Sequence, residues 1–317
     1  MKTRAAVLIL GLLASGCRSS NHPVVPASLA SNPNTTATIT QTMDEPGRWT
    51  VETINAADWA VPLGGLVNLK HSEAKAAGLE PHDEPIQVYF HALRHPEHGL
   101  FIVDTGVEEA QVEAPDEAAF RGVVAKALPA DTLEVHVTTA DWLADQPEPL
   151  AGVFLTHLHL DHVMGLPDVP VGTPIYLGPG ETSERNLSNV FMRKVFRSAL
   201  EGHDAVREWQ FSEDLDGRFA GVVDVFGDAS VWAIHAPGHT PGSTAFLVRT
   251  AEGPVLLTGD VSHTAWGWEH GVEPGTYSSD KVASAQSFHA LRGFAMEHPT
   301  LDVRLGHQPA NSASAGH

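Results

Sequence analysis

The chain has 317 residues, with 39 Asp and Glu against 19 Lys and Arg, so its formal net charge is −20 at pH 7 with neutral histidines. A protein this acidic repels phosphate backbones, which argues against nucleic acid as a partner. Cys17 is the only cysteine, which excludes an intrachain disulfide and a metal site built on thiolates.

The N-terminus has the pattern of an export signal. Residues 1–4 carry two cations, residues 5–14 are almost continuously apolar, and the stretch ASGC follows at 14–17. An apolar segment of this length is typical of a secretory signal and is too short to span a bilayer. Its end resembles the bacterial lipobox, in which the cysteine becomes the lipidated N-terminus. We therefore expect export to the periplasm, with Cys17 as the lipid anchor to the outer membrane. Ordinary cleavage beside an incidental cysteine is the alternative.

Composition divides the rest of the chain into three parts. Residues 18–46 are mostly Ser, Asn, Thr, Pro and Ala, and such a segment cannot bury enough surface to offset its ordering entropy. Residues 47–309 have the length of one large domain, whereas residues 310–317 are small and polar. We expect a signal peptide over 1–17, a disordered tether over 18–46, one domain over 47–309 and a frayed tail.

Strand-like and helix-like segments alternate within the domain. Apolar runs bounded by Gly and Pro predict strands at residues 49–54, 86–93, 100–103, 150–155, 174–177, 221–226, 231–234, 243–249, 255–258 and 301–305. Apolar residues at helical spacing predict helices over 116–128, 181–201 and 280–298. This mixture indicates an α/β fold in which helices cover sheets.

The stretch THLHLDH, residues 156–162, directly follows one of the predicted strands. It places His157, His159 and His162 within six positions of one another, together with Asp161. Crowded imidazoles repel one another once protonated, whereas neutral imidazole and carboxylate are the ligands that zinc and similar divalent metals bind. The stretch therefore predicts a metal site at the end of this strand.

Four further stretches place a His or an Asp beside Gly or Pro, where a predicted strand breaks into a turn. They are FIVDTG with Asp104, APGHTPGS with His239, LLTGD with Asp260 and RLGHQ with His307. Strand ends that gather at one edge of a sheet are where α/β proteins build their sites. His235 lies four residues before His239 but falls within its strand, so we prefer His239 as a ligand.

These motifs in this order resemble the metallo-β-lactamase superfamily, from Asp104 to His307. The resemblance implies an αββα sandwich, in which two mixed β-sheets are covered by helices, and a metallo-hydrolase domain over 47–309. It also implies two divalent metal ions in a groove between the sheets, usually Zn²⁺. Manganese, iron and cobalt accept the same kinds of ligand.

The resemblance also implies a role for each motif residue. By the family's pattern, His157, His159 and His239 hold the first metal, Asp161, His162 and His307 hold the second, and Asp260 bridges both. Asp104 matches an Asp that hydrogen-bonds behind the ligands, with a turn-forming Asp as the alternative. Two cations that share one water lower its pKa, so that a bridging hydroxide forms at neutral pH.

The branch of the superfamily is indicated by the run LLTGDVSH and by Gly306-His307, which resemble N-acyl-homoserine lactonases and phosphotriesterase-like relatives. The run GHTPGST also resembles β-lactamases. Where well-known lactonases have a Tyr that contacts the substrate, this chain has His263. We expect His263 to donate a hydrogen bond or a proton in its place, or else to be a wall of the groove.

We therefore expect a dinuclear metal-dependent hydrolase in which hydroxide attacks the carbonyl of a lactone or ester, a small neutral or apolar molecule. Asp161 and His263 are the predicted catalytic side chains. Phe191, Met192 and Phe196 are either core or a lid, and Trp266, Trp268 and Tyr277 either line the pocket or anchor a loop. A phosphotriesterase, a β-lactamase and a non-catalytic zinc-binding lipoprotein are the alternatives. Membrane contact is expected only through the N-terminal lipid.

Overall fold

The computed structural model describes residues 19–27, 35–122, 124–125, 128, 132–184 and 189–309, except for the side chains of 189–191. The predicted signal peptide with Cys17 and the predicted tail lie outside these residues. Within the described part of the chain, no helix is both long and apolar enough to cross a membrane.

Two β-sheets form the centre of the fold. The larger has eight strands in the order β1-β8-β7-β6-β4-β3-β2-β5, and the smaller has five in the order β13-β12-β11-β10-β9. The larger sheet contains β1 (Val24–Pro26), β2 (Thr50–Pro62), β3 (Asp83–His95), β4 (Gly99–Val103), β5 (Glu134–Val135), β6 (Leu150–Phe154), β7 (Ile175–Leu177) and β8 (Val206–Glu208). The smaller contains β9 (Gly221–Asp224), β10 (Val231–His235), β11 (Thr244–Thr250), β12 (Gly253–Leu257) and β13 (Asp302–Arg304). All ten strands predicted from the sequence are confirmed, whereas β1, β5 and β8 were not anticipated.

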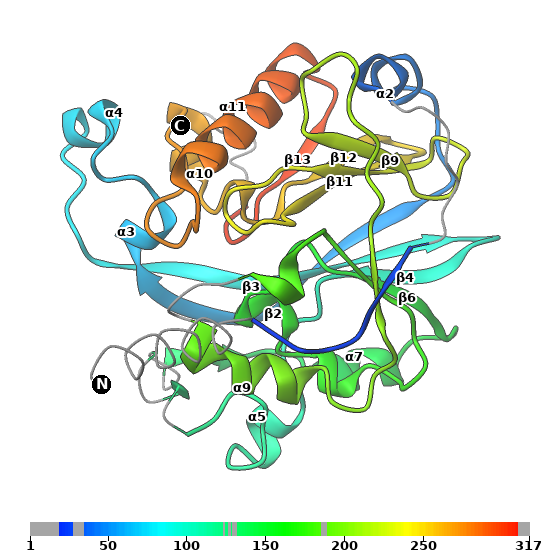
Figure 1. Ribbon diagram of the computed structural model, residues 1–317, viewed down its shortest axis with the longest axis vertical. Helices are drawn as coiled ribbons and strands as arrows, with labels where there is room; N and C mark the ends of the chain where they lie inside the picture. The colour runs from blue at the N-terminus through cyan, green and yellow to red at the C-terminus, as the bar shows by residue number, and fades with distance from the viewer. Residues whose placement is uncertain are drawn as a thin grey trace, which may run out of the picture.

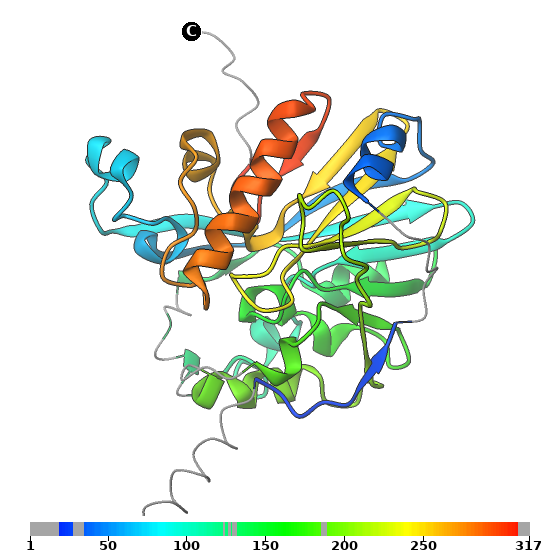
Figure 2. The same ribbon diagram turned by 45° about the horizontal axis from the view of Figure 1, so that its top comes forward.

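Helices cover the outer faces of both sheets, as Figures 1 and 2 show. Over the smaller sheet lie α2 (Thr36–Thr42), α10 (Ala265–His270) and α11 (Lys281–Glu297), and over the larger lie α5 (Ala110–Glu113), α7 (Thr139–Ala144) and α9 (Asn189–Ala199). The other described α-helices are α3 (Leu63–Leu66), α4 (Ser72–Ala76) and α8 (Leu160–Val163). This arrangement confirms the predicted αββα sandwich.

Strand β11 illustrates why the apolar runs lack a polar face. Phe246 and Val248 pack into the core between the two sheets, whereas Ala245 and Leu247 pack into the core under α11. Successive side chains of a strand point to opposite faces, and here both faces are covered. A continuous apolar run is therefore the expected pattern for this strand.

Of the three predicted helices, one is confirmed in full and two only in part. The helix over 280–298 is confirmed as α11, where Asp280 caps the first turn by accepting from Val282 N and Ala283 N at 3.0 Å. The prediction of a helix over 116–128 is wrong for residues 116–122. These residues form turns and bends that end at Gly122, which has φ 69°. The helix over 181–201 is confirmed only for α9, which is preceded by a 3₁₀ turn at Glu181–Ser183.

The predicted disordered tether is wrong for residues 35–46. Helix α2 buries Ile39 and Met43 completely, in a core shared with Trp232 and Phe294, while Asp214 accepts hydrogen bonds from the backbone and hydroxyl of Thr36. Strand β1 also pairs with β8. Two apolar side chains one turn apart are enough to dock a short helix into a pocket that the sheet and α11 already form. An average over composition misses so local a signal.

The anchoring of α2 can be tested by removing the Ile39 side chain. Ile39→Ala should lower the free energy of unfolding by about 2–4 kcal/mol, because it leaves a cavity in a filled core. Urea denaturation of the protein beginning at residue 19 measures this effect. Val282→Ala, at a position 70% exposed on α11, is the control and should change stability by less than about 0.5 kcal/mol. An unchanged urea midpoint for Ile39→Ala would mean that α2 does not contribute to the core.

Candidate metal centre

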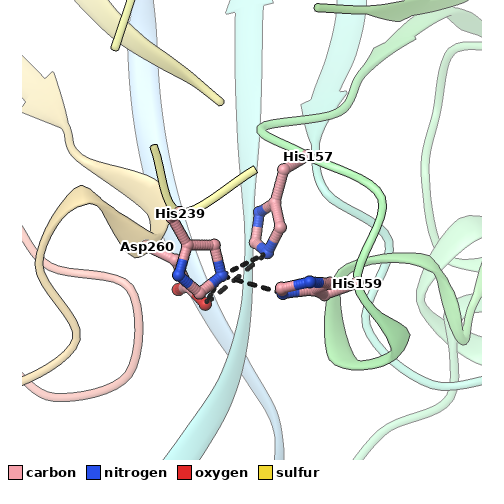
Figure 3. Close-up of side chains that lie close together, drawn as sticks. All are labelled: His157, His159, His239 and Asp260. Atoms are coloured by element: carbon pink, nitrogen blue, oxygen red, sulfur yellow. Dashed lines mark hydrogen bonds and ion pairs between the residues drawn. The ribbon is translucent and has the colours of Figure 1, made fainter. Parts of the chain in front are cut away.

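The predicted ligands come from the ends of strands in both sheets. Residues 155–162 follow β6, which is parallel to β4 and β7. His239 lies in the turn between β10 and β11, Asp260 in a 3₁₀ turn after β12, and His307 after β13. Figure 3 shows His157 and His159 approaching from one side, and His239 and Asp260 from the other. The site therefore lies where the ends of the two sheets meet.

Seven side chains form two clusters, in the grouping that the sequence predicts. His157, His159, His239 and Asp260 form the first cluster, and Asp161, His162 and His307 form the second. Within each cluster, one ligand atom per residue lies within 4.8 Å of the others. In the first cluster, His239 Nε2 is 3.1 Å from His157 Nε2 and 2.8 Å from His159 Nδ1.

The Asp260 carboxylate lies between the clusters and faces each with a different oxygen. Its Oδ2 is 3.2 Å from His239 Nε2 and 3.6 Å from His157 Nε2. Its Oδ1 is 3.1 Å from His307 Nε2 and 3.4 Å from His162 Nε2. The carboxylate thus has the position that a bridging ligand requires. A side chain at Gly306 would collide with this carboxylate, so glycine there allows the approach.

The protonation states of the first cluster favour the binding of a cation, because its imidazoles are neutral and its carboxylate is ionised. Burial lowers the pKa of His157 well below its usual value, lowers that of His159 to about 3 and also lowers that of His239. These rings therefore stay neutral at pH 7, as a metal ligand must. Burial by itself would raise the pKa of Asp260, but His307, His263 and His162 hold it well below its usual range. The carboxylate is therefore ionised.

Several buried atoms at the centre lack a hydrogen-bond partner in the described structure, among them His162 Nε2, Asp260 Oδ1 and His263 Nε2. Buried polar atoms in folded proteins are nearly always paired. In the second cluster, burial opposes protonation of His162 and His307, but Asp260 and neighbouring acids raise the pKa of both rings. The field that draws protons to these rings also attracts a cation. The donor set therefore fits divalent metal ions.

Asp104 lies behind the second cluster and bonds to the loop that carries it. It accepts hydrogen bonds from Thr156 N at 2.8 Å and from His162 Nδ1 at 2.7 Å, which turns His162 Nε2 toward the other ligands. Asp104 itself has φ 60°, a left-handed backbone that Asp tolerates better than most residues do. His307 is oriented similarly, because its Nδ1 donates to the carbonyl of Gln87 at 2.9 Å.

Glu181 joins the two ligand-bearing loops and was not anticipated. Its Oε2 accepts from Leu158 N at 2.8 Å, between His157 and His159, and its Oε1 accepts from Gly242 N at 2.7 Å, just after His239. The side chain is buried, which raises the pKa of Glu181 to about 7, although its hydrogen bonds act in the opposite direction. The sequence carries no signal for this role, since Glu181 begins a segment with a helical pattern.

A cavity of about 450 Å³ opens onto both clusters. Its apolar lining comes from Trp59, Val61, Leu66, Ile86, Leu128, Leu160, Met192, Phe196 and Tyr277. The remaining lining residues are His159, Asp161, His239, Asp260, His263, Thr276, Ser278 and His307, so no Lys or Arg of the described chain is among them. The cavity therefore suits a neutral ligand with an apolar part.

Of the other residues singled out in the sequence, some line this cavity and some lie elsewhere. Met192 and Tyr277 line it, while the Phe191 side chain is outside the described structure. Trp266 stacks on His270 instead, and Trp268 packs against Phe288. His235 stacks on Phe211 and bonds the carbonyl of Pro241, away from both clusters, which agrees with the choice of His239.

Comparison with known proteins identifies the family. Residues 83–288 match the Metallo-beta-lactamase superfamily. The chain belongs to this superfamily. It is 30% identical over 250 residues to the N-acyl homoserine lactonase AttM of Rhizobium johnstonii, covering 77% of this chain and 88% of the relative. Superfamily membership and the two clusters together support a metal-dependent hydrolase.

Two solved structures share the fold of this metallo-β-lactamase superfamily chain. One is an N-acyl homoserine lactone hydrolase with the product N-hexanoyl-L-homoserine bound at its catalytic metal centre (TM-score 0.57, 21% identity, 81% of this chain and 92% of that chain). The other is AidC, a dizinc quorum-quenching lactonase (TM-score 0.50, 15% identity, 84% of this chain and 90% of that chain).

The role of Asp104 can be tested with Asp104→Asn. An amide tolerates the left-handed backbone but can replace only one of the two acceptor oxygens, so His162 loses its fixed orientation. We expect metal affinity at the second cluster to fall by about 10–100-fold, measured by titration against a chromophoric chelator. Asp145→Asn, at an exposed position, should leave both affinities unchanged. Equal affinities in Asp104→Asn and the wild type would contradict the role assigned to Asp104.

The crosslink made by Glu181 predicts a loss of stability in Glu181→Gln. The amide NH₂ would face the N–H of either Leu158 or Gly242, which leaves a buried donor unpaired and costs about 1–3 kcal/mol. Urea unfolding of the metal-free protein measures this cost separately from metal affinity. Glu201→Gln, at an exposed position, is the matched control. If both variants unfold at the wild-type midpoint, Glu181 does not hold the loops together.

Proposed function

We propose that this chain is a dinuclear lactonase that opens neutral lactones carrying an apolar substituent, of which N-acyl homoserine lactones are the leading candidates. The observation that carries the proposal is the largely apolar cavity, with no Lys or Arg among its described lining residues, that opens onto both clusters. An acyl homoserine lactone combines a reactive carbonyl with an uncharged apolar chain. The AttM relative and the hydrolase with N-hexanoyl-L-homoserine support the same substrate class.

Different residues of the site would have different roles in the reaction. Metal ions bound by the two clusters would supply a hydroxide nucleophile at neutral pH and polarise the lactone carbonyl. Asp161 lines the cavity with 18% of its side chain exposed, so it can accept a hydrogen bond from the attacking group and orient it. Tyr277 lines the same cavity, and burial raises the pKa of its phenol to about 12. Its hydroxyl therefore stays protonated and can donate to a substrate oxygen.

The cavity also separates this proposal from the alternatives. β-Lactam antibiotics carry a carboxylate, and the lining offers no Lys or Arg to pair with it. Phosphotriesters are neutral and would meet the same lining, so they remain a second candidate that differs in the atom attacked. For the metal we propose zinc, because histidine and carboxylate ligands suit it and a structural neighbour is a dizinc lactonase.

We also propose that the protein is exported and anchored in the periplasm through a lipid on Cys17. The support for this proposal is the sequence pattern of residues 1–17. Because β1 and α2 belong to the folded domain, the domain would begin close to the lipid rather than after a long tether. This placement would give the enzyme access to lactones that enter from outside the cell.

The proposed activity can be tested with the protein from residue 19 onward, which keeps β1 and α2. It is assayed on an acyl homoserine lactone, an aryl ester, a phosphotriester and a cephalosporin. We expect the lactone to be opened fastest, the chelator-treated protein to be inactive, and added Zn²⁺ to restore turnover. His239→Ala should lower the rate at least about 100-fold, because several kcal/mol of transition-state stabilisation depend on the metals.

His235→Ala is the matched control for this assay, since His235 is four residues away but faces away from the clusters. It should keep both its metals and most of its activity. Two bound metals without chelator-sensitive turnover of any substrate would favour a non-catalytic zinc-binding lipoprotein. A preference for the cephalosporin or the phosphotriester would replace lactone opening with that reaction.

A further inference from the structure

The loop between α10 and α11, residues 271–280, is docked on the short helix α3 through backbone hydrogen bonds. Gly275 N donates to the carbonyl of Gly65 at 3.1 Å, and Thr276 N donates to the carbonyl of Gly64 at 2.9 Å. Helix α3 itself contributes Leu66 to the lining of the cavity. The loop is therefore attached to an element of the cavity wall.

The next residue of this loop, Tyr277, places its ring directly against Gly65. Tyr277 lines the cavity and is 39% exposed, whereas Gly65 is buried. A Cβ added at Gly65 would lie 2.2 Å from Cε2 and 2.3 Å from Cζ of the Tyr277 ring. Because carbon atoms in contact are about 3.5–4.0 Å apart, any side chain at residue 65 would displace the ring by more than about 1 Å.

Gly64 precedes Gly65 in the same helix but has room for a side chain. Among the described residues, a Cβ at Gly64 would meet only Leu69 Cδ1, at 3.5 Å, which is an ordinary contact. Neither glycine has a positive φ, so the backbone conformation does not require glycine at either position. The three atoms nearest to a Cβ at residue 65 all belong to Tyr277. The need for glycine there comes from this ring.

We propose that Gly65 is a positioning residue, which lets the Tyr277 ring lie back against α3 and so sets the size of the apolar substituent that the lactone can carry. This inference rests on the proposed function. A methyl group at residue 65 would move the ring away from α3, and the ring borders the cavity. A displacement of this size is comparable with one methylene group, which changes the selectivity of an apolar pocket by about 10–200-fold.

The proposal can be tested by comparing kcat/KM for N-decanoyl and N-butanoyl homoserine lactone in the zinc-loaded protein. The ratio of the two values does not depend on the fraction of folded enzyme, so a loss of stability by itself leaves it unchanged. We expect Gly65→Ala to lower the ratio of decanoyl to butanoyl at least about 10-fold, because the displaced ring occupies room that the longer chain needs. Gly64→Ala is the matched control and should keep the wild-type ratio.

A double variant shows whether Gly65 acts through the ring of Tyr277. In Tyr277→Ala the side chain that a Cβ at residue 65 would meet is absent. Adding Gly65→Ala to Tyr277→Ala should therefore leave the ratio at the value of Tyr277→Ala. The double variant should also fold if Gly65→Ala by itself does not, because the collision is removed. Failure of the double variant to fold would mean that glycine is required for another reason, and would overturn the proposal.

The outcomes separate this inference from the proposed function. If the wild type opens both lactones and Gly65→Ala keeps the wild-type ratio, Gly65 does not set the size of the substituent and the lactonase proposal stands. If the wild type with its metals bound opens neither lactone, the proposed function fails and this inference fails with it. A lower ratio in Gly65→Ala, with no further change when the substitution is added to Tyr277→Ala, supports positioning through the ring.

Discussion

The convergence of buried lone pairs on a small volume is the constraint on which the centre of this protein depends. Asp260 turns one oxygen toward each cluster, and burial keeps the surrounding imidazoles of the first cluster neutral. Such a group of acceptors is unfavourable in a protein interior unless positive charge is bound among them. An arrangement of this kind favours the binding of divalent cations among the acceptors, and bound cations would in turn stabilise the folded protein.

A second set of contacts, hydrogen bonds to the far side of the rings, fixes the direction in which these lone pairs point. The outward nitrogens of His162, His263 and His307 are held by Asp104, Leu66 and Gln87. Each of these partners belongs to the larger sheet or to the segments directly adjoining it, whereas Asp260, His263 and His307 follow strands of the smaller sheet. The contacts of His263 and His307 therefore tie the two sheets together at the metal centre. Glu181 adds a further tie between the loops that carry the first cluster.

The cavity that opens onto the two clusters bears on the choice of substrate. Its floor is polar and its walls are apolar, with Trp59, Met192 and Phe196 on the wall and Asp161 at the floor. A neutral substrate can place its reactive carbonyl over the polar floor and bury its apolar part against the walls. The overall charge of −20 acts in the same direction, since it disfavours anionic substrates at a distance. The cavity thus sets the position of the substrate carbonyl, whereas the net charge of the whole chain disfavours anionic substrates.

Much of the metal centre could be predicted before the structure was known, because ligand chemistry limits which residue types occur at close spacing. THLHLDH alone provides four of the seven clustered side chains, and the Gly and Pro residues beside His239, Asp260 and His307 mark the strand ends where a site can form. Ten of the described strands were predictable as well, because runs such as β11 are covered on both faces and are therefore almost continuously apolar, whereas the short strands β1, β5 and β8 were not anticipated.

The sequence by itself determined the ligand types, most of the strands and the family, because these depend on spacing along the chain. Only the tertiary structure decided what depends on contacts between distant segments. Such contacts include the bond from Glu181 to Gly242, 61 residues apart, and the docking of α2 against the smaller sheet. They also include the bond from His263 to Leu66, which sets the tautomer of the ring. A lone Glu or His carries no periodic pattern, so its role appears only when folding brings its partner within hydrogen-bonding distance.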